Sequence, residues 1–170
     1  MRLFPKIILA LIVLAPAVSA QSQRPANCEI ATVQDPERQV LSCAFGVTIE
    51  LDAAAQMGFL GVTDGGAPDV IELDSGAVLL EVAPGEARPQ IRTPHAIAAV
   101  RGTIYVVEVE GDKTSVFVIE GEVAVTQRDA NGADVILRAG DGVDVRDGAA
   151  LEARPWPAER AAGLLARFGR

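Results

Sequence analysis

Short runs of alternating hydrophobic and polar residues, each preceded by a turn rich in Gly, Asp or Pro, fill the sequence from Cys28 onward. A period of two is typical of a β-strand with one buried face. The clearest runs begin at a glycine and cover residues 46–51, 76–82, 102–109, 121–125 and 142–145. Weaker runs lie at residues 70–73, 114–119 and 134–137. Turns such as Glu110-Gly111-Asp112 and Asn131-Gly132 favour hairpins between them.

Almost no helical pattern separates these runs, which argues against a parallel α/β sheet, whose strands need longer crossovers. We therefore predict an all-β domain. The later leading glycines, Gly102, Gly121 and Gly142, are spaced almost evenly, which is typical of stacked two-strand units. The pattern leaves three arrangements open: a sandwich, a roll or a short β-solenoid.

One amphipathic helix is predicted at the C-terminus, within residues 156–170. Pro157 can occupy a first helical turn, and apolar residues follow at helical spacing. These apolar residues are Ala161, Leu164, Leu165 and Phe168. Charged residues lie off this stripe, so its apolar side must be covered. Three covers are considered: the domain's own sheet, a partner protein, or a membrane surface, which the small number of positive charges disfavours.

The first twenty residues have the three parts of a secretory signal peptide. Arg2 and Lys6 are positive, the run 7–14 is apolar, and small residues at 18–20 predict cleavage before Gln21. The apolar run is too short for a membrane span, which needs about 20 residues. Gln21 stands where a lipoprotein would need cysteine, so no lipid anchor is expected. Export to the periplasm is the expectation.

Residues 21–170 have the usual size of one domain, divided here into a β domain at 21–155 and the helix. Loss of Arg2 and Lys6 changes the formal charge from −8 to −10, because the signal contains two positive charges and no acids. Such a charge disfavours nucleic acid and anionic lipid as partners. The core must consist mainly of Val, Ile, Leu and Ala, a composition that favours strands.

Cys28 and Cys43 would reach a compartment where disulfides persist, and we predict that they pair. A bond between them would stabilise the fold by about 3 kcal/mol in the chain-entropy model. Two separate buried thiols are the alternative. A metal site is disfavoured, since only His95 could join the cysteines and its distance in the sequence gives no ligand spacing.

Residues 91–106, IRTPHAIAAVRGTIYV, carry the most distinctive motif of the chain. Thr-Pro, then small apolar residues, then Val-Arg-Gly-Thr and a strand closely resemble the signature of the FecR domain family. The pattern continues through 116–125 and closes at 137–143. At its widest the resemblance covers residues 76–145. The signature residues are Thr93, Pro94, Val100, Arg101, Gly102, Thr103 and Gly121.

The resemblance implies an extracytoplasmic all-β module in a Gram-negative host. The family is best known from regulators that relay a signal from an outer-membrane receptor to a cytoplasmic sigma factor. Such relays carry a membrane-spanning helix and a sigma-binding segment, whereas this sequence shows a cleavable signal and no later apolar span. We therefore expect a binding or signalling accessory module that contacts an envelope protein. The alternative is a structural envelope protein that binds cell-wall or surface glycan.

Catalytic residues are not evident, and we predict that the protein is not an enzyme. His95 is the only histidine and has no visible catalytic partner. No Gly-x-Ser-x-Gly motif surrounds a serine, although nucleophilic hydrolases of that class need one. Acids such as Glu108, Glu110, Glu120 and Glu122 could converge on one face, yet solvated strand edges explain them adequately.

Metals and cofactors are likewise not predicted. The segments 64–69 and 141–144 offer oxygen ligands of the kind that calcium binds, but Asp-Gly turns need no metal and neither segment matches an EF-hand. Arg101 could grip a carboxylate in bidentate fashion, although the Arg-Gly-Thr element is better explained as a bend that glycine permits before a strand.

Overall fold

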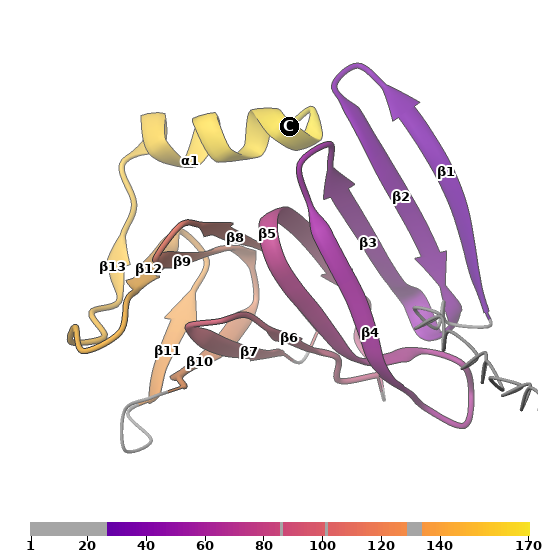
Figure 1. Cartoon of the computed structure of the whole chain (residues 1–170), viewed down its shortest axis with the longest axis horizontal. Coiled ribbons are helices and arrows are strands. Elements are labelled where there is room, and N and C mark those ends of the chain that lie inside the picture. The colour runs from indigo at the N-terminus through magenta and orange to yellow at the C-terminus, as the bar shows by residue number, and fades with distance from the viewer. Residues whose placement is uncertain (1–26, 86, 101, 129–133) are drawn as a thin grey trace, which may run out of the picture.

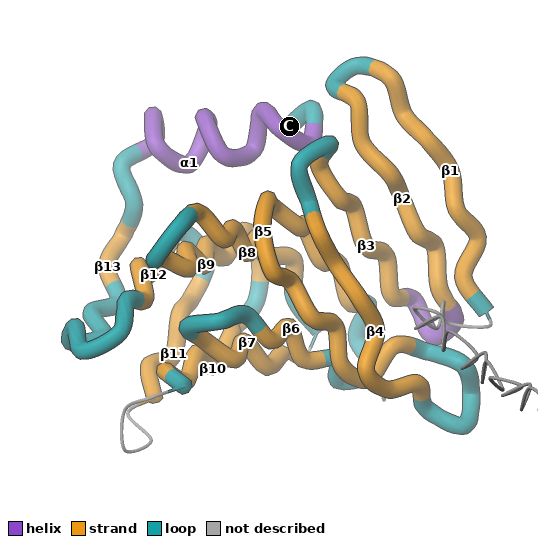
Figure 2. Tube along the Cα trace, viewed as in Figure 1, coloured by secondary structure: helices purple, strands orange, loops and turns teal. Residues whose placement is uncertain are grey.

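A computed structural model describes residues 27–85, 87–100, 102–128 and 134–170. The predicted signal peptide, Arg101 and the Asn131-Gly132 turn lie outside the described residues. The prediction of an all-β domain with one C-terminal helix is confirmed (Figure 2). No helix among the described residues is long and apolar enough to cross a membrane.

The described strands form one continuous sheet that curls into a half-barrel with two facing parts (Figure 1). Sheet A contains, in spatial order, β1 (Cys28–Gln34), β2 (Glu37–Cys43), β3 (Val47–Asp52), the second half of β5 (Pro68–Val82), β8 (Ile104–Glu110), β9 (Lys113–Glu120), β12 (Asp141–Val145) and β13 (Arg154–Pro155). Sheet B contains β4 (Gln56–Val62), the first half of β5, β6 (Gln90–Arg92), β7 (Ala96–Val100), β10 (Glu122–Gln127) and β11 (Asp134–Arg138). Neighbours are antiparallel except β5 and β6.

Three short helical elements complete the described chain: η1 (Ala44–Gly46), α1 (Ala158–Leu165) and η2 (Ala166–Phe168). Helix α1 lies on the side of sheet A that faces away from sheet B (Figure 1). All eight predicted runs are found as strands, but the runs at 70–73 and 76–82 are parts of the single strand β5. The predicted runs do not include strands β1, β2, β4, β6, β7 and β13. In β1 and β4 no side chain is fully buried and no regular alternation is present, and β6 and β13 have only three and two residues.

The main core lies between the two sheets. It consists almost entirely of Val, Ile, Leu and Ala side chains, with Tyr105 as the one fully buried aromatic ring of this cluster. Burial raises the pKa of the Tyr105 phenol well above its usual range. The predicted aliphatic composition of the core is therefore observed, and it suits strands that pack face to face.

Two glycines of the family signature bring two chain crossings into contact. Gly102 lies between β7 of sheet B and β8 of sheet A, and Gly121 lies between β9 of sheet A and β10 of sheet B. Both have positive φ, 62° and 88°, where side chains other than glycine are strained. A Cβ on Gly121 would lie 2.7 Å from the Gly102 carbonyl oxygen. The buried Thr103 hydroxyl donates to the Glu122 carbonyl at 3.0 Å and so joins the same two crossings.

We predict that Gly121→Ala lowers the free energy of unfolding by about 3 kcal/mol, because it adds a backbone clash to the cost of a left-handed alanine. Gly140→Ala is the matched control: Gly140 has φ of 87°, but a Cβ added there would meet no atom within 4 Å, so only about 1 kcal/mol should be lost. Urea unfolding of both variants measures the difference. Equal losses would show that the contact between the crossings is unimportant.

Candidate functional site

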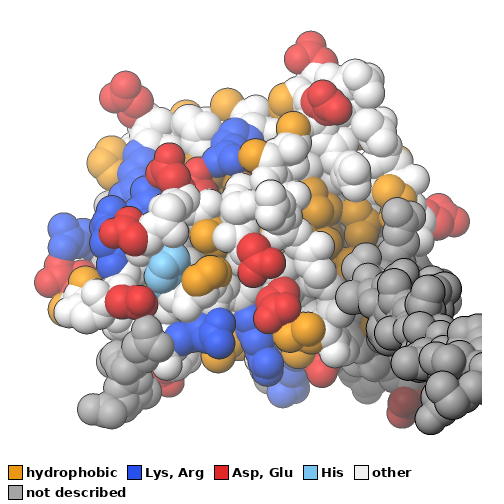
Figure 3. Space-filling model, in the orientation of Figure 1, with side chains coloured by type: hydrophobic (Ala, Val, Ile, Leu, Met, Phe, Trp, Pro, Cys, Tyr) orange, Lys and Arg blue, Asp and Glu red, His pale blue; other side chains and the backbone are white. Residues whose placement is uncertain are grey.

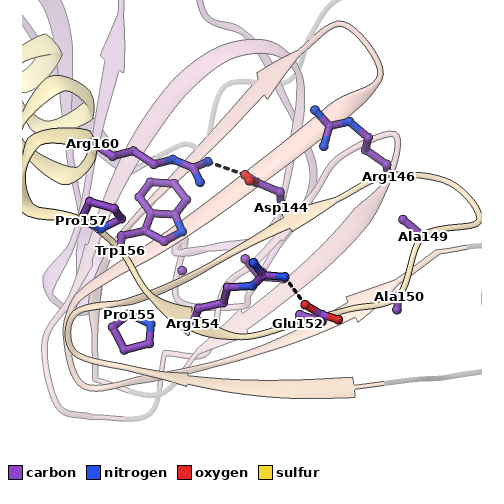
Figure 4. A pocket seen from close by; sticks show the side chains of 12 residues that line it. Asp144, Arg146, Ala149, Ala150, Glu152, Arg154, Pro155, Trp156, Pro157 and Arg160 are labelled. Carbon is purple, nitrogen blue, oxygen red and sulfur yellow. Dashed lines mark hydrogen bonds and ion pairs between the residues drawn. The ribbon is translucent and has the colours of Figure 1, made fainter.

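A groove of about 610 Å³ lies where β12, β13 and the start of α1 meet (Figure 4). Three arginines line it, and each comes from a different part of the chain's last segment: Arg146 follows β12, Arg154 opens β13, and Arg160 belongs to α1. Trp156 lies between the latter two. The groove is therefore built by the path that the chain takes from the sheet to the helix.

Trp156 anchors this path to sheet A. Its ring stacks on Phe117 of β9 with 5.2 Å between centroids, and a Cβ on Gly142 would lie 2.3 Å from the indole nitrogen. The Arg160 guanidinium lies over the indole, 3.5 Å from its centroid, at a distance where a cation and an aromatic face attract. The ring is thus packed by a phenyl ring, a backbone and a guanidinium, and it is not an open platform for a ligand.

Asp144 fixes the position of Arg160. Its carboxylate accepts hydrogen bonds from Arg160 and, at 2.7 Å, from the Ser115 hydroxyl. Partial burial raises the pKa of Asp144, but the hydrogen bonds from Arg160 and Ser115 and the charges of Arg160 and Lys113 outweigh it, so the pKa lies below its ordinary value. Arg160 is therefore held between a carboxylate and an aromatic ring.

The other two arginines are more available. Arg154 pairs with Glu152, and its side chain remains 69% exposed. Arg146 lies 3.8 Å from Asp112 and is 48% exposed. Exposed ion pairs of this kind contribute little free energy, so a carboxylate from another molecule can compete for these guanidinium groups. Figure 3 shows Lys and Arg side chains gathered over this side of the molecule, although the chain as a whole carries a formal charge of −8.

The apolar stripe of the C-terminal helix lies on sheet A. Leu164 and Phe168 are buried, and Ala161 and Leu165 are partly buried, in a cluster separate from the main core. The sheet side of this cluster consists of Ala77, Leu79, Val106 and Phe117. Since this sheet face covers the stripe, the apolar side of the helix is not open to a partner in the described structure.

Two arginines that are not part of the apolar stripe form ion pairs between the end of the helix and acids of the sheet. Arg167 pairs with Asp52 and Glu108. Arg170 lies 2.8 Å from Glu50, a carboxylate that Arg38 also contacts at 2.8 Å. Partly buried pairs that share partners contribute more than isolated surface pairs, so both apolar packing and charge hold the helix in place.

The signature residues have structural positions rather than a common site. The buried Thr93 hydroxyl accepts the Ala96 backbone N–H at 2.9 Å and lies 2.8 Å from the Thr114 hydroxyl. The Thr114 hydroxyl is also 3.0 Å from Nδ1 of the buried His95. Pro94 lies in the same turn and Val100 ends β7. Arg101, the signature residue with a candidate binding role, lies outside the described residues.

Cys28 and Cys43 form the predicted disulfide, which joins β1 to β2. Three of the four candidate acids pair with different cations: Glu108 with Arg167, Glu110 with Lys113, and Glu122 with Arg138. No group of three or more metal-binding side chains is present among the residues that the structure describes. The Asp141 carboxylate accepts the Arg138 backbone N–H at 3.1 Å, so this carboxylate is already engaged by the protein's own backbone.

Sequence reasoning missed the arginine groove. The sequence feature that points to it is a cluster of three arginines, Arg146, Arg154 and Arg160, within 15 residues of an acidic chain. The only tryptophan of the sequence lies in the same segment. Such a recurrence indicates a site only when the turns between the arginines are known, since those turns bring the three side chains together.

The family model for the FecR protein matches residues 29–124, more than half of the chain. The chain belongs to the FecR family. The match begins at Glu29 in β1, one residue after Cys28, so it includes most of the β1–β2 hairpin, whereas the motif-based resemblance began at residue 76. The arginine groove and the C-terminal helix follow the matched residues. No curated protein matches this FecR-family chain.

Two crystal structures share the fold, each of a "putative anti-sigma factor" from Parabacteroides distasonis ATCC 8503. They superpose with TM-scores of 0.62 and 0.61 at 18% sequence identity. In each case the alignment covers 81% of this chain and 64% of the other. At this identity the likeness establishes the fold alone, over slightly less than two thirds of each neighbour's length.

We predict that Leu164→Asp lowers the thermal midpoint by roughly 6–12 °C, because it places an unpaired charge against the sheet. Ala162→Asp is the control, since Ala162 is exposed on the same helix and should cost about 1–2 °C. Thermal unfolding followed by circular dichroism measures both. An unchanged midpoint for Leu164→Asp would mean that the stripe does not belong to the folded core.

A second prediction concerns the pH dependence of the Asp144 contacts. The lowered pKa means that Asp144 stabilises the fold above the pKa of an unfolded aspartate and that this contribution is lost as the pH falls through the folded value. Asp144→Asn should therefore be less stable than the parent at neutral pH, and the gap should narrow between about pH 5 and pH 2. Urea midpoints across this range test it. The exposed Asp147→Asn is the control, and a constant gap for Asp144→Asn would contradict the prediction.

Proposed function

We propose that this FecR-family protein is a periplasmic accessory module that binds an envelope protein in a signalling process, and that the arginine groove receives an acidic segment of that partner. The observation that carries the proposal is the groove itself: two exposed guanidinium groups and one fixed guanidinium lie together on an otherwise acidic protein. Arginine binds carboxylates in a bidentate geometry and is enriched at protein interfaces.

Family membership, a sequence prediction and the geometry of Arg160 support this proposal. Family membership associates the fold with regulators, and the structural neighbours described as putative anti-sigma factors have the same architecture. The predicted signal peptide supports a periplasmic location. The Arg160 side chain is also held in place by Asp144 and Trp156. Its conformation is therefore fixed before a partner binds, which reduces the entropy lost on binding.

The geometry favours a protein partner over a glycan. Sugar rings commonly stack on an open aromatic face, and Trp156 is already packed against Phe117 and Arg160. Carboxylate recognition by exposed guanidinium groups instead suits a flexible acidic segment, and charge complementarity of this kind mainly increases the association rate and the specificity.

We expect the tagged protein, recovered from the periplasm, to enrich one envelope protein after reversible crosslinking and mass spectrometry. Charge reversal by Arg146→Glu with Arg154→Glu should reduce that enrichment at least about tenfold, because two attractive contacts become repulsive. Arg138→Glu is the matched control, since this arginine is 70% exposed and lies on β11, outside the groove.

Three results would contradict the proposal. Equal loss in the Arg138→Glu control would mean that net charge, and not the groove, governs capture. Recovery of cell-wall fragments alone would favour the glycan-binding alternative. A bait that stays in the cytoplasm would refute the proposed location.

A further inference from the structure

The outer edge of β1 differs from the other free strand edges of the described sheet. β13 has two residues, one of them proline, and β4 is interrupted by three register shifts along β5. β11 has charged residues at both ends, Asp134 and Arg138. Short, irregular or charged edges are the usual protection against pairing with another chain. β1 is neither short nor irregular, and only one of its seven residues is charged.

β1 is regular, and five of its seven residues are exposed. It pairs with β2 through seven consecutive residue pairs without a register shift, and no other described strand pairs with it. Most of its side chains are exposed, among them Ile30 at 46%. It contains no lysine or proline, and Glu29 is its only charged residue. The disulfide to β2 keeps one end of this edge in place.

The disulfide also shows which backbone groups face outward. Cys28 and Cys43 are directly opposite each other with Cα atoms 4.0 Å apart, the short spacing of a non-hydrogen-bonded antiparallel pair. Because the two pair types alternate along a strand, Ile30 and Thr32 also occupy non-hydrogen-bonded positions against β2. Their N–H and C=O groups therefore point away from β2, toward the open edge.

We propose that β1 pairs with β1 of a second copy of this chain in an antiparallel, two-fold symmetric arrangement that continues sheet A across two molecules. Outward-facing residues must be opposite one another for their backbone groups to bond. Ile30 is then opposite Thr32 of the second copy, and Ala31 lies on the two-fold axis opposite Ala31 of the second copy. In this register all seven residues of β1 overlap.

The same register makes the strand complementary to itself. Glu29 is opposite Val33 of the second copy, and the two Glu29 residues are four positions apart, about 13 Å along the strand. That separation exceeds the screening length at physiological salt, so no like charges oppose each other. A shift of the two strands by two residues keeps the outward-facing backbone groups opposite one another, but fewer residues of the two β1 strands then pair. Such registers are therefore disfavoured. An isologous contact of this kind closes as a dimer and leaves no further β1 edge.

The first test is the mass in solution. Light scattering on the protein purified from the envelope fraction, over a dilution series, should show a concentration-dependent monomer–dimer equilibrium. Ile30→Lys should weaken the dimer at least about tenfold, because lysine on an edge strand opposes pairing. Leu60→Lys is the matched control, since Leu60 is 58% exposed on the β4 edge, and it should leave the dimer intact. Circular dichroism checks that both variants are folded.

The second test reads the register directly. Ala31→Cys should form an intermolecular disulfide on mild oxidation, because the two Ala31 positions are adjacent on the axis. Val33→Cys, on the same face of the same strand, should not, since its two copies are separated by four positions. A monomer at every concentration, or crosslinking of both variants alike, would overturn the proposal. Dimerisation that survives Ile30→Lys would assign the interface to another surface.

Discussion

The bend in β5 is the constraint on which the rest of the fold depends. The first half of this 15-residue strand buries one face, at Ile71 and Leu73, whereas residues 77–80 are buried on both faces. The change occurs at Gly76, which has φ of 79° and whose Cβ would lie 2.5 Å from the Ala55 backbone. One strand thereby contributes to both sheets, and the sheet must curl over the core between them.

Burial on both faces of sheet A requires a cover, and the C-terminal helix supplies it. Asp52 links the bend to this cover, because its carboxylate accepts the Ala77 backbone N–H at 3.1 Å and also pairs with Arg167 of the last turn. The chain must cross from β12 to the helix to reach this position. Trp156 fixes the crossing against Phe117, and the arginine groove is a result of the same path.

Sequence patterns locate the elements whose side chains alternate between core and more exposed positions, such as β10. They also locate β8 and β9, whose runs of apolar residues are buried on both faces. They also indicate the disulfide, since two cysteines in a chain predicted to be exported have few other uses. β1 could not be predicted because both of its faces are largely exposed and no alternation remains. The pattern divides β5 in two because Gly76 interrupts it like a turn. The groove depends on contacts between β9, β12 and α1, which lie apart in the sequence, so local periodicity contains no trace of it.

The two proposed surfaces lie at opposite edges of sheet A, since β1 is the first strand of its spatial order and β13 the last. Pairing through β1 would therefore leave both grooves at the far ends of a continuous sheet, free to bind at the same time. A partner that is itself dimeric, or clustered in the envelope, would then meet two acidic-segment sites on one rigid body. The second contact becomes intramolecular, so two weak grooves can give tight binding without any additional contact. Because the dimer forms only at sufficient protein concentration, the affinity for such a partner depends on that concentration. This dependence suits an accessory protein whose binding to its partner must be reversible.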